Sequence, residues 1–194
     1  MESRRAAEII STMLNPLFVA APTLLALLIS ERPSNLPALA LVVLAFGTVV
    51  PLTILYVLVR RGALPDMHIS NREDRCVAFV SVMSSYVLGA ILLLLASAPP
   101  IVTAVILCYL GNSLIMMLIS IRWKISIHAS GITGPVTVLA YSLGAVGLFL
   151  FGLAVPVGWA RIRLGVHTLS QVVAGALLTV ATTWLQLRIY LTLL

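Results

Sequence analysis

The segment WARIRLGVHTLSQVVAG, residues 159–175, combines an imidazole with side chains that can orient it. Gln171 lies four residues after His167 and so shares its face of a helix. An amide there can hold one ring nitrogen and leave the other as a nucleophile. Arg161, six residues before the histidine, can bind phosphate oxygens through two parallel hydrogen bonds. A structural explanation stays open, because Thr168 and Gln171 also have the spacing of a helix capping box.

Two further polar segments interrupt the apolar sequence. RWKISIHASG, residues 122–131, carries the cation Lys124 and a second imidazole, His128. SNREDR, residues 70–75, carries Arg72 and Arg75. Ionisable groups are expensive in a membrane and often mark the path or the binding site of a substrate. We therefore treat these side chains as candidate ligands of an anion.

The elements that must position these residues are transmembrane helices. Hydrophobic residues make up 61% of the chain and charged residues 9%, with a mean hydropathy of +1.13. A soluble domain has about 25% charged residues. The sequence therefore predicts an all-α, polytopic transmembrane helix bundle that forms one domain over residues 1–194. Its uncharged runs cover residues 9–30, 36–59, 76–121, 129–160 and 168–187.

The lengths of these runs give the number of crossings, because one crossing needs about 20 apolar residues. The first run is too long for the apolar part of a signal peptide, so we interpret it as a retained helix. The run at 76–121 must cross twice, with a turn at Pro99 and Pro100. The run at 129–160 fits either one long helix or two short helices with a break at 142–144. We expect six to seven helices and favour seven.

The positions of the positive charges favour the count of seven. With two short helices, ten of the twelve Lys and Arg residues share one membrane face. Snorkelling at the interface explains the cations of the N-terminus and of residues 60–61, but not the histidines His68, His128 and His167 beside the others. The positive-inside rule turns this face towards the cytoplasm. The ten cations are Arg4, Arg5, Arg60, Arg61, Arg72, Arg75, Arg122, Lys124, Arg161 and Arg163.

The segment ARIRLGVHTLSQVVAG resembles the third signature of the type 2 phosphatidic acid phosphatase superfamily, the membrane lipid phosphate phosphatases. That signature reads S-R, five residues, H, three residues, D, usually with Leu-Gly before the His and Ala-Gly after the Asp. This sequence departs from it at Ala160, which replaces the Ser, and at Gln171, which replaces the Asp. The residues in register are Arg161, Gly165, His167 and Gly175.

The second signature of that superfamily, P-S-G-H, is half present. Ser130 and Gly131 match, whereas Ala129 replaces the Pro and Ile132 replaces the His. His128, four residues before that position, can substitute for the missing imidazole. The local pattern K-I-S-x-H-x-S-G resembles a divergent branch of the superfamily.

The first signature, K, six residues, R-P, is the weakest match. His68 and Arg75 have the right spacing, but Cys76 replaces the Pro. Arg72 and Arg75 together can supply the positive charge. The resemblance as a whole covers residues 66–175.

The resemblance implies a phosphatase that needs no metal or other cofactor and acts on a membrane lipid phosphate through a phosphohistidine. His167 would be the nucleophile, His128 the acid that protonates the leaving group, and Gln171 the residue that orients the nucleophile. The implied phosphate ligands are Arg161, Lys124, Arg75, Arg72 and the backbone amides of Ser130 and Gly131. We expect these two amides just before a helix that opens near Pro135, because a helix N-terminus binds anions.

The sequence argues against two classes of membrane transferase and leaves two alternatives to the phosphatase open. Prenyltransferases and phosphatidyl-alcohol transferases hold metal ions with acid-rich motifs, and this chain has only six Asp and Glu residues. A metal site at Asp66, His68 and His128 is an alternative that chelation would test. The main rival is a non-catalytic lipid-phosphate binder or transporter, since the Asp is lost and the second His displaced.

The expected partners are the lipid bilayer and a membrane lipid phosphate, with no nucleic acid. Because the loops are short, a small phosphate headgroup on a long apolar chain fits best. Polyprenyl diphosphate, phosphatidic acid and phosphatidylglycerol phosphate all qualify, and the first is preferred. The expected location is the cell membrane, with the site on the cytoplasmic face and the oligomeric state left open.

Overall fold

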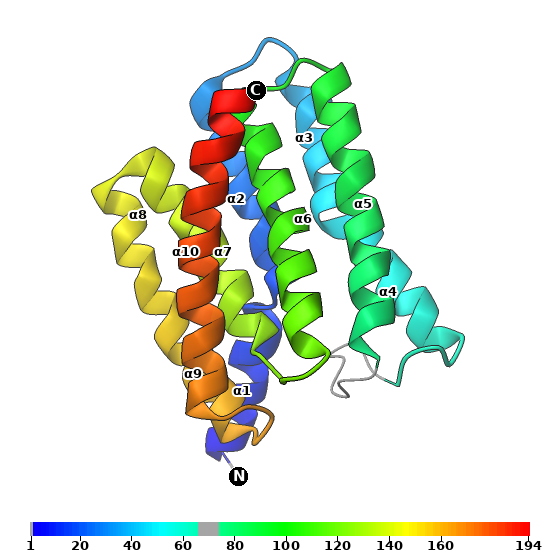
Figure 1. The fold of residues 1–194 in the computed structure, drawn as a ribbon, viewed down its shortest axis with the longest axis vertical. Helices are drawn as coiled ribbons and strands as arrows, with labels where there is room; N and C mark the ends of the chain where they lie inside the picture. Colours follow the sequence, from blue (N-terminus) through cyan, green and yellow to red (C-terminus); the bar gives the residue numbers. More distant parts are fainter. Residues whose placement is uncertain (1, 66–73) are drawn as a thin grey trace.

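The computed structural model describes residues 2–65 and 74–194, which form a bundle of helices with no strand among them (Figure 1). The predicted all-α class is therefore confirmed. The elements are α1 (Glu2–Met13), α2 (Pro16–Glu31), α3 (Leu36–Leu44), the π-helical turn η1 (Ala45–Val49), α4 (Val50–Arg60), α5 (Arg75–Leu95), α6 (Pro100–Ser120), α7 (Ile127–Leu143), α8 (Ala145–Phe149), the 3₁₀ turn η2 (Leu150–Leu153), α9 (Ala154–Arg163) and α10 (Leu169–Leu193).

Four continuous helical segments of the described chain are long and apolar enough to cross a membrane. They are Leu36–Arg60, Arg75–Leu95, Pro100–Ser120 and Leu169–Leu193. The pair α1 and α2, bent by 45°, adds a fifth segment if it counts as one span. The chain is thus a polytopic membrane protein, and the expected turn at Pro99 and Pro100 is confirmed by the start of α6.

The two remaining crossings of the seven expected correspond to α7 and to α8–α9, which pack against each other as a hairpin of shorter helices. The break between them lies where it was expected, because α7 ends at Leu143 and Gly144 has a φ of 62°. A positive φ is a conformation that glycine adopts without steric cost. Neither half is long and apolar enough to cross by itself, so length and hydropathy give four or five crossings within the described residues, against the six to seven expected.

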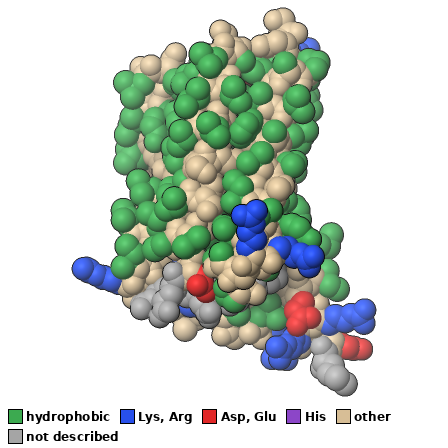
Figure 2. All heavy atoms as spheres, turned by 90° about the vertical axis from the view of Figure 1, so that its right-hand side faces the viewer, with side chains coloured by type: hydrophobic (Ala, Val, Ile, Leu, Met, Phe, Trp, Pro, Cys, Tyr) green, Lys and Arg blue, Asp and Glu red, His purple; other side chains and the backbone are tan. Residues whose placement is uncertain are grey.

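The described cations lie mostly at one end of the bundle. The start of α1, the end of α4, the start of α5, the α6–α7 connection and the end of α9 all meet at the lower end in Figure 1. Figure 2 shows most of the visible Lys and Arg side chains at this end, below a belt of hydrophobic side chains. The expectation that the cations share one face is confirmed for the described residues, which do not include Arg72.

A sharp bend between α1 and α2 shapes this end of the bundle. Asn15 caps α2, since its Oδ1 accepts a hydrogen bond of 3.0 Å from the Leu17 amide, and Pro16 occupies the first turn. The amphipathic helix α1 therefore leaves the direction of α2 and packs against α9. Ala7 and Ser11 form its buried side.

A second irregularity divides α3 from α4. The π-helical turn η1 contains Gly47 and is followed by Pro51, and π-turns of this kind bend a helix. Two hydroxyls anchor the turn: Ser85 Oγ donates to the Phe46 carbonyl at 2.9 Å and Thr48 Oγ1 to the Leu17 carbonyl at 2.8 Å. Below η1, α4 diverges from the vertical direction of the bundle in Figure 1.

Buried polar side chains join α6 to α10 in the centre of the bundle. Asn112 Nδ2 donates to Thr183 Oγ1 at 2.8 Å. Its Oδ1 accepts from Thr182 Oγ1 at 2.8 Å and from Gln186 Nε2 at 2.9 Å. A buried amide is stabilising only when it is hydrogen bonded, so this network fixes how the two helices are aligned.

Small residues let α10 approach α7 and the segment before it. A Cβ built on Gly175 would lie 2.6 Å from the Ser126 carbonyl oxygen, and one on Gly134 would lie 3.1 Å from Thr179 Cγ2. Ser130 Oγ and Thr179 Oγ1 form a hydrogen bond of 2.6 Å across the same interface. Close approach of helices at small residues is typical of membrane proteins.

Gly175→Ala should destabilise the protein, because the added methyl group would collide with backbone rather than with a flexible side chain. Overpacking of this kind costs about 1–3 kcal/mol, so the thermal unfolding midpoint in detergent should fall by several degrees. Gly152→Ala is the control, since nothing lies within 4 Å of a Cβ at that glycine. Equal midpoints for the two variants would contradict the close α7–α10 contact.

Candidate functional site

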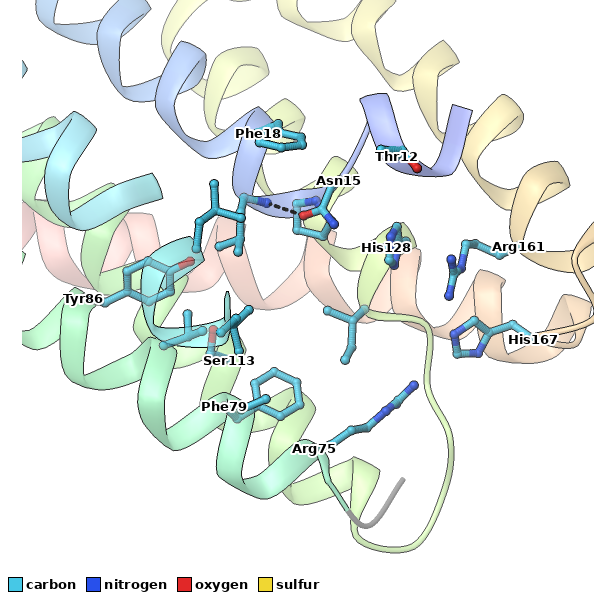
Figure 3. A pocket seen from close by; sticks show the side chains of 17 residues that line it. Thr12, Asn15, Phe18, Arg75, Phe79, Tyr86, Ser113, His128, Arg161 and His167 are labelled. Atoms are coloured by element: carbon cyan, nitrogen blue, oxygen red, sulfur yellow. Dashed lines mark hydrogen bonds between the residues drawn. The ribbon is translucent and has the colours of Figure 1, made fainter. Parts of the chain in front are cut away.

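A cavity of about 330 Å³ lies near the charged end of the bundle. At one end of it are two arginines and two histidines, Arg75, Arg161, His128 and His167 (Figure 3). They come from α5, α9, α7 and the α9–α10 connection, so four separate parts of the chain build this end. The sequence analysis had named all four as site residues, and the structure brings them together.

His167 is held in one tautomer by two oxygen atoms. Its Nδ1 lies 3.2 Å from Gln171 Oε1 and 3.2 Å from the Lys124 carbonyl oxygen. Because both neighbours are hydrogen-bond acceptors, Nδ1 must carry the proton in the neutral ring. Nε2 then has the lone pair, which is the arrangement that a nucleophilic imidazole needs.

Gln171 orients His167 and caps α10 at the same time. Its Oε1 also accepts a hydrogen bond of 3.1 Å from the backbone N–H of Thr168. The backbone N–H of Gln171 in turn donates to Thr168 Oγ1 at 3.4 Å. The capping box and the contact with the imidazole were alternatives in the sequence, and both occur. The cap fixes the position of the amide oxygen, so the first turn of α10 orients the histidine.

The pKa of His167 is lowered from 6.5 to about 4. Burial is the largest cause, because it disfavours the charged imidazolium, and the positive charge of Arg161 is the next. The hydrogen bond that His167 donates to Gln171 acts in the opposite direction and raises the pKa. At neutral pH the ring is therefore uncharged, with Nε2 unprotonated.

Arg75 is the first residue of α5 and only 3% exposed. Its Nη1 donates to Ser120 Oγ at 3.2 Å and to the Ile125 carbonyl at 3.0 Å, and neither acceptor is charged. Its Nε is buried with no hydrogen-bond partner among the described residues. A guanidinium buried with neutral partners provides a favourable position for an anion.

Arg161 lies in the last turn of α9 and is 6% exposed. Its Nη1 donates to Ser11 Oγ of α1 at 2.7 Å, so α1 holds the guanidinium from outside the cavity. Figure 3 shows this guanidinium beside the rings of His128 and His167. Two arginines on either side of an imidazole suit the binding of a phosphate group.

His128 is the second residue of α7 and is buried. Helix α7 begins at Ile127 because Ser126 caps it, accepting a hydrogen bond of 3.3 Å from the Ala129 amide. The positive end of the helix dipole is thus directed at the cavity through residues 127 and 128, both of which line it.

This helix start corrects two site predictions. Ser130 and Gly131 lie inside α7, not before a helix that opens near Pro135. The Ser130 amide bonds to the Ser126 carbonyl at 3.2 Å, and a Cβ on Gly131 would contact Pro16. Their backbone amides are therefore not phosphate ligands, because intrahelical bonds and packing occupy them. A proline within a helix can follow a capped start, which the sequence analysis had not considered.

The other predicted ligands have different outcomes. Lys124 acts through its carbonyl group, which accepts from His167, and its charge lowers the pKa of that histidine. Lys124 is not among the residues that line the cavity. The described residues do not include Arg72, His68 or Asp66. Of the alternative metal site at Asp66, His68 and His128, the structure therefore describes only His128. Within the described residues no group of three or more metal-ligating side chains occurs.

Two residues that contact the arginines were missed by the sequence analysis. Ser11 and Ser120 accept hydrogen bonds from Arg161 and Arg75, and both serines are buried. A serine in an apolar helix is common, and these two are far from their partners in sequence. Only the packing of α1 on α9 and of α5 on α6 reveals their role.

The site can bind a tetrahedral anion between two guanidinium groups and present a neutral imidazole to it. Comparison with models of known protein families, with characterised proteins and with solved structures found no match to this chain.

Gln171→Glu should raise the pKa of His167, because a carboxylate of the same length stabilises the imidazolium. In histidine-labelled protein followed by NMR, the wild-type ring should titrate near pH 4 and the variant at clearly higher pH. The His167 signal is assigned by its loss in His167→Gln. Ser170→Glu is the control, since Ser170 is exposed on the same turn. Wild-type titration near 6.5 would contradict the burial of the ring, and an equal rise in the control would contradict the contact with Gln171.

Proposed function

We propose that the protein is an integral-membrane phosphatase that hydrolyses a phosphomonoester or diphosphate of a membrane lipid. One observation carries this proposal: the buried Arg75, whose hydrogen-bond partners among the described residues are neutral, lines the same cavity as an imidazole whose Nε2 has its lone pair available. An anion that also undergoes nucleophilic attack would use both features. A site for simple anion binding would need the arginines but not the oriented histidine.

The proposed first step is attack of His167 Nε2 on phosphorus. An N–P bond forms as the bond from phosphorus to the lipid oxygen breaks, and the leaving oxygen takes a proton from His128. In the second step water attacks phosphorus, the N–P bond breaks, and His128 accepts the proton of the water. Inorganic phosphate leaves from a monoester, and both histidines return to their starting states.

The arginines would stabilise the charge that builds up on the phosphoryl oxygens. Arg75 and Arg161 are held by Ser120 and Ser11, so their orientation is set before a substrate binds. Donors fixed in advance stabilise a transition state more than donors that must reorganise. Gln171 keeps the nucleophile in the required tautomer, although a neutral amide supports the developing imidazolium less than a carboxylate would.

The rest of the cavity supports a lipid rather than a soluble phosphate ester. Away from the four charged or ionisable residues, its walls are formed largely by apolar side chains of α2, α4 and α5. These include Leu17, Leu55 and Phe79. A ligand with an anionic head and an apolar chain matches both ends of the cavity.

A second candidate function is a binder or transporter of lipid phosphates that does not cleave them. The observation in its favour is Gln171 itself, because the residue that orients the nucleophile carries no charge. The two candidates share the same ligand class and the same pocket. They differ in whether phosphate is released.

Phosphate release by the purified protein should persist in excess EDTA and disappear in His167→Ala. Arg75→Gln should lower kcat/KM by about 10²–10³, the loss seen when one donor to a transition-state oxyanion is removed. Arg60→Gln is the matched control, since Arg60 is exposed at the end of α4 and contacts the Tyr56 ring. Its kcat/KM should stay at the wild-type value. Unfolding midpoints would verify that each variant is folded.

The possible results separate the two candidates. Release that requires a metal, or that survives in His167→Ala, would contradict the phosphohistidine mechanism. Intact protein that binds lipid phosphates without releasing phosphate would establish the binder or transporter.

The charged end of the bundle, with the site, is proposed to face the cytoplasm of a cell membrane, in accordance with the positive-inside rule. Ala63, just after α4, is exposed at this end. In a background with Cys76 and Cys108 replaced, Ala63→Cys should react with a membrane-impermeant maleimide only after cells are permeabilised. Leu95→Cys, at the opposite end of α5 and exposed, should react without permeabilisation. The reverse pattern would refute this orientation.

A further inference from the structure

The cavity continues from the charged site as an apolar arm between α2, α4 and α5. Phe79 and Val82 line it from α5, and Tyr86 lies one turn beyond Val82 on the same helix. Leu55 of α4 and Phe18 of α2 lie across from them. Figure 3 shows the arm extending from the Arg75 and His167 end towards Tyr86. The arm is therefore continuous with the place where a phosphate would bind.

This arm is open to the membrane side of the bundle. Phe18 lines it and is nevertheless 47% exposed, whereas Leu55 across the arm is buried. The divergence of α4 below η1 contributes to the opening, because α4 leaves the direction of the bundle there. On an apolar transmembrane surface an exposed phenylalanine contacts lipid chains. A hydrocarbon chain in the arm can thus extend into the bilayer past Phe18.

The size of the cavity limits what the arm can hold. Its total volume of about 330 Å³ is near the lower end of the roughly 300–1,000 Å³ of small-molecule pockets. A phosphate group between Arg75 and Arg161 uses part of that volume. The remaining volume has room for the start of one chain, but not for a glycerol with the starts of two acyl chains.

We infer that the arm between α2, α4 and α5 selects lipid phosphates with a single hydrocarbon chain over those with two. This inference rests on the proposed function for the headgroup and adds the class of the apolar part. The arginines bind the phosphate, the arm binds the first part of the chain, and the rest of the chain lies in the bilayer. Polyprenyl and single-chain acyl phosphates belong to the favoured class, and phosphatidic acid does not.

The test uses two substrates that differ only in the second chain: oleoyl lysophosphatidic acid and dioleoyl phosphatidic acid. In detergent micelles the wild-type kcat/KM should be about tenfold or more higher for the single-chain substrate, as expected for steric discrimination in an apolar pocket. Equal values, or a preference for the two-chain lipid, would overturn the inference.

Two variants of α5 locate the selectivity in the arm. Val82→Phe narrows the arm and should raise the KM for lysophosphatidic acid by about tenfold, while butyl phosphate, too short to fill the arm, should keep its kcat/KM. Val80→Phe makes the same change two residues away, where the side chain is 57% exposed and does not line the cavity. It should leave both substrates unchanged. Equal effects of the two variants would overturn the assignment to the arm.

A binding measurement separates this inference from the proposed chemistry. Non-hydrolysable phosphonate analogues of the two lipids would be compared by displacement of a fluorescent alkyl phosphonate. Tighter binding of the single-chain analogue, weakened by Val82→Phe alone, would support the arm even if no lipid released phosphate. Hydrolysis of both lipids together with equal binding of their analogues would reject the arm and leave the phosphatase intact.

Discussion

Burial of the Arg75 guanidinium at the end of an apolar bundle is the constraint on which this site depends. A buried charge is costly unless hydrogen bonds and an opposite charge offset the cost. Ser120 and the Ile125 carbonyl satisfy part of the guanidinium and fix α5 against the end of α6 and the segment that follows it. They provide no negative charge. In the proposed function a bound phosphate group supplies it.

Capping of α10 is linked to the proposed chemistry at His167. Gln171 Oε1 accepts from both the Thr168 amide and the imidazole, so the start of α10 and the tautomer of the ring are set by one atom. The Lys124 carbonyl adds a second acceptor from the connection between α6 and α7. Burial and nearby positive charge lower the pKa of the ring, which keeps it neutral at ordinary pH, as the proposed attack on phosphorus requires.

Two irregular points in the helices shape the cavity at the charged end of the bundle. The bend at Asn15 carries α1 away from α2 and onto α9, where Ser11 holds Arg161. The π-helical turn η1 lets α4 diverge, and the apolar arm lies between α2, α4 and α5. Straight helices would pack along their whole length and leave little room for a lipid chain. The charged site and the apolar arm therefore both depend on breaks in otherwise regular helices.

Features that depend on local spacing and composition were predictable from the sequence. Apolar runs predicted the helical membrane fold, Pro99 and Pro100 the turn before α6, and residues 142–144 the break that Gly144 makes. The spacing of four residues placed Gln171 on His167, because neighbours on one helix face must meet. The composition also identified Arg75, Arg161 and His128 as candidates, because ionisable side chains are rare in such an apolar chain.

Contacts between distant segments became visible only in the folded chain, and so did one helix start. The sequence suggested a start near Pro135, whereas Ser126 caps α7 well before it, which places Ser130 and Gly131 inside α7. Ser11 and Arg161 are 150 residues apart, and no local pattern connects them. The apolar arm likewise lies between three helices, where α4 leaves the direction of the bundle. Such features depend on how whole helices pack, and packing is not encoded in the spacing of any single segment.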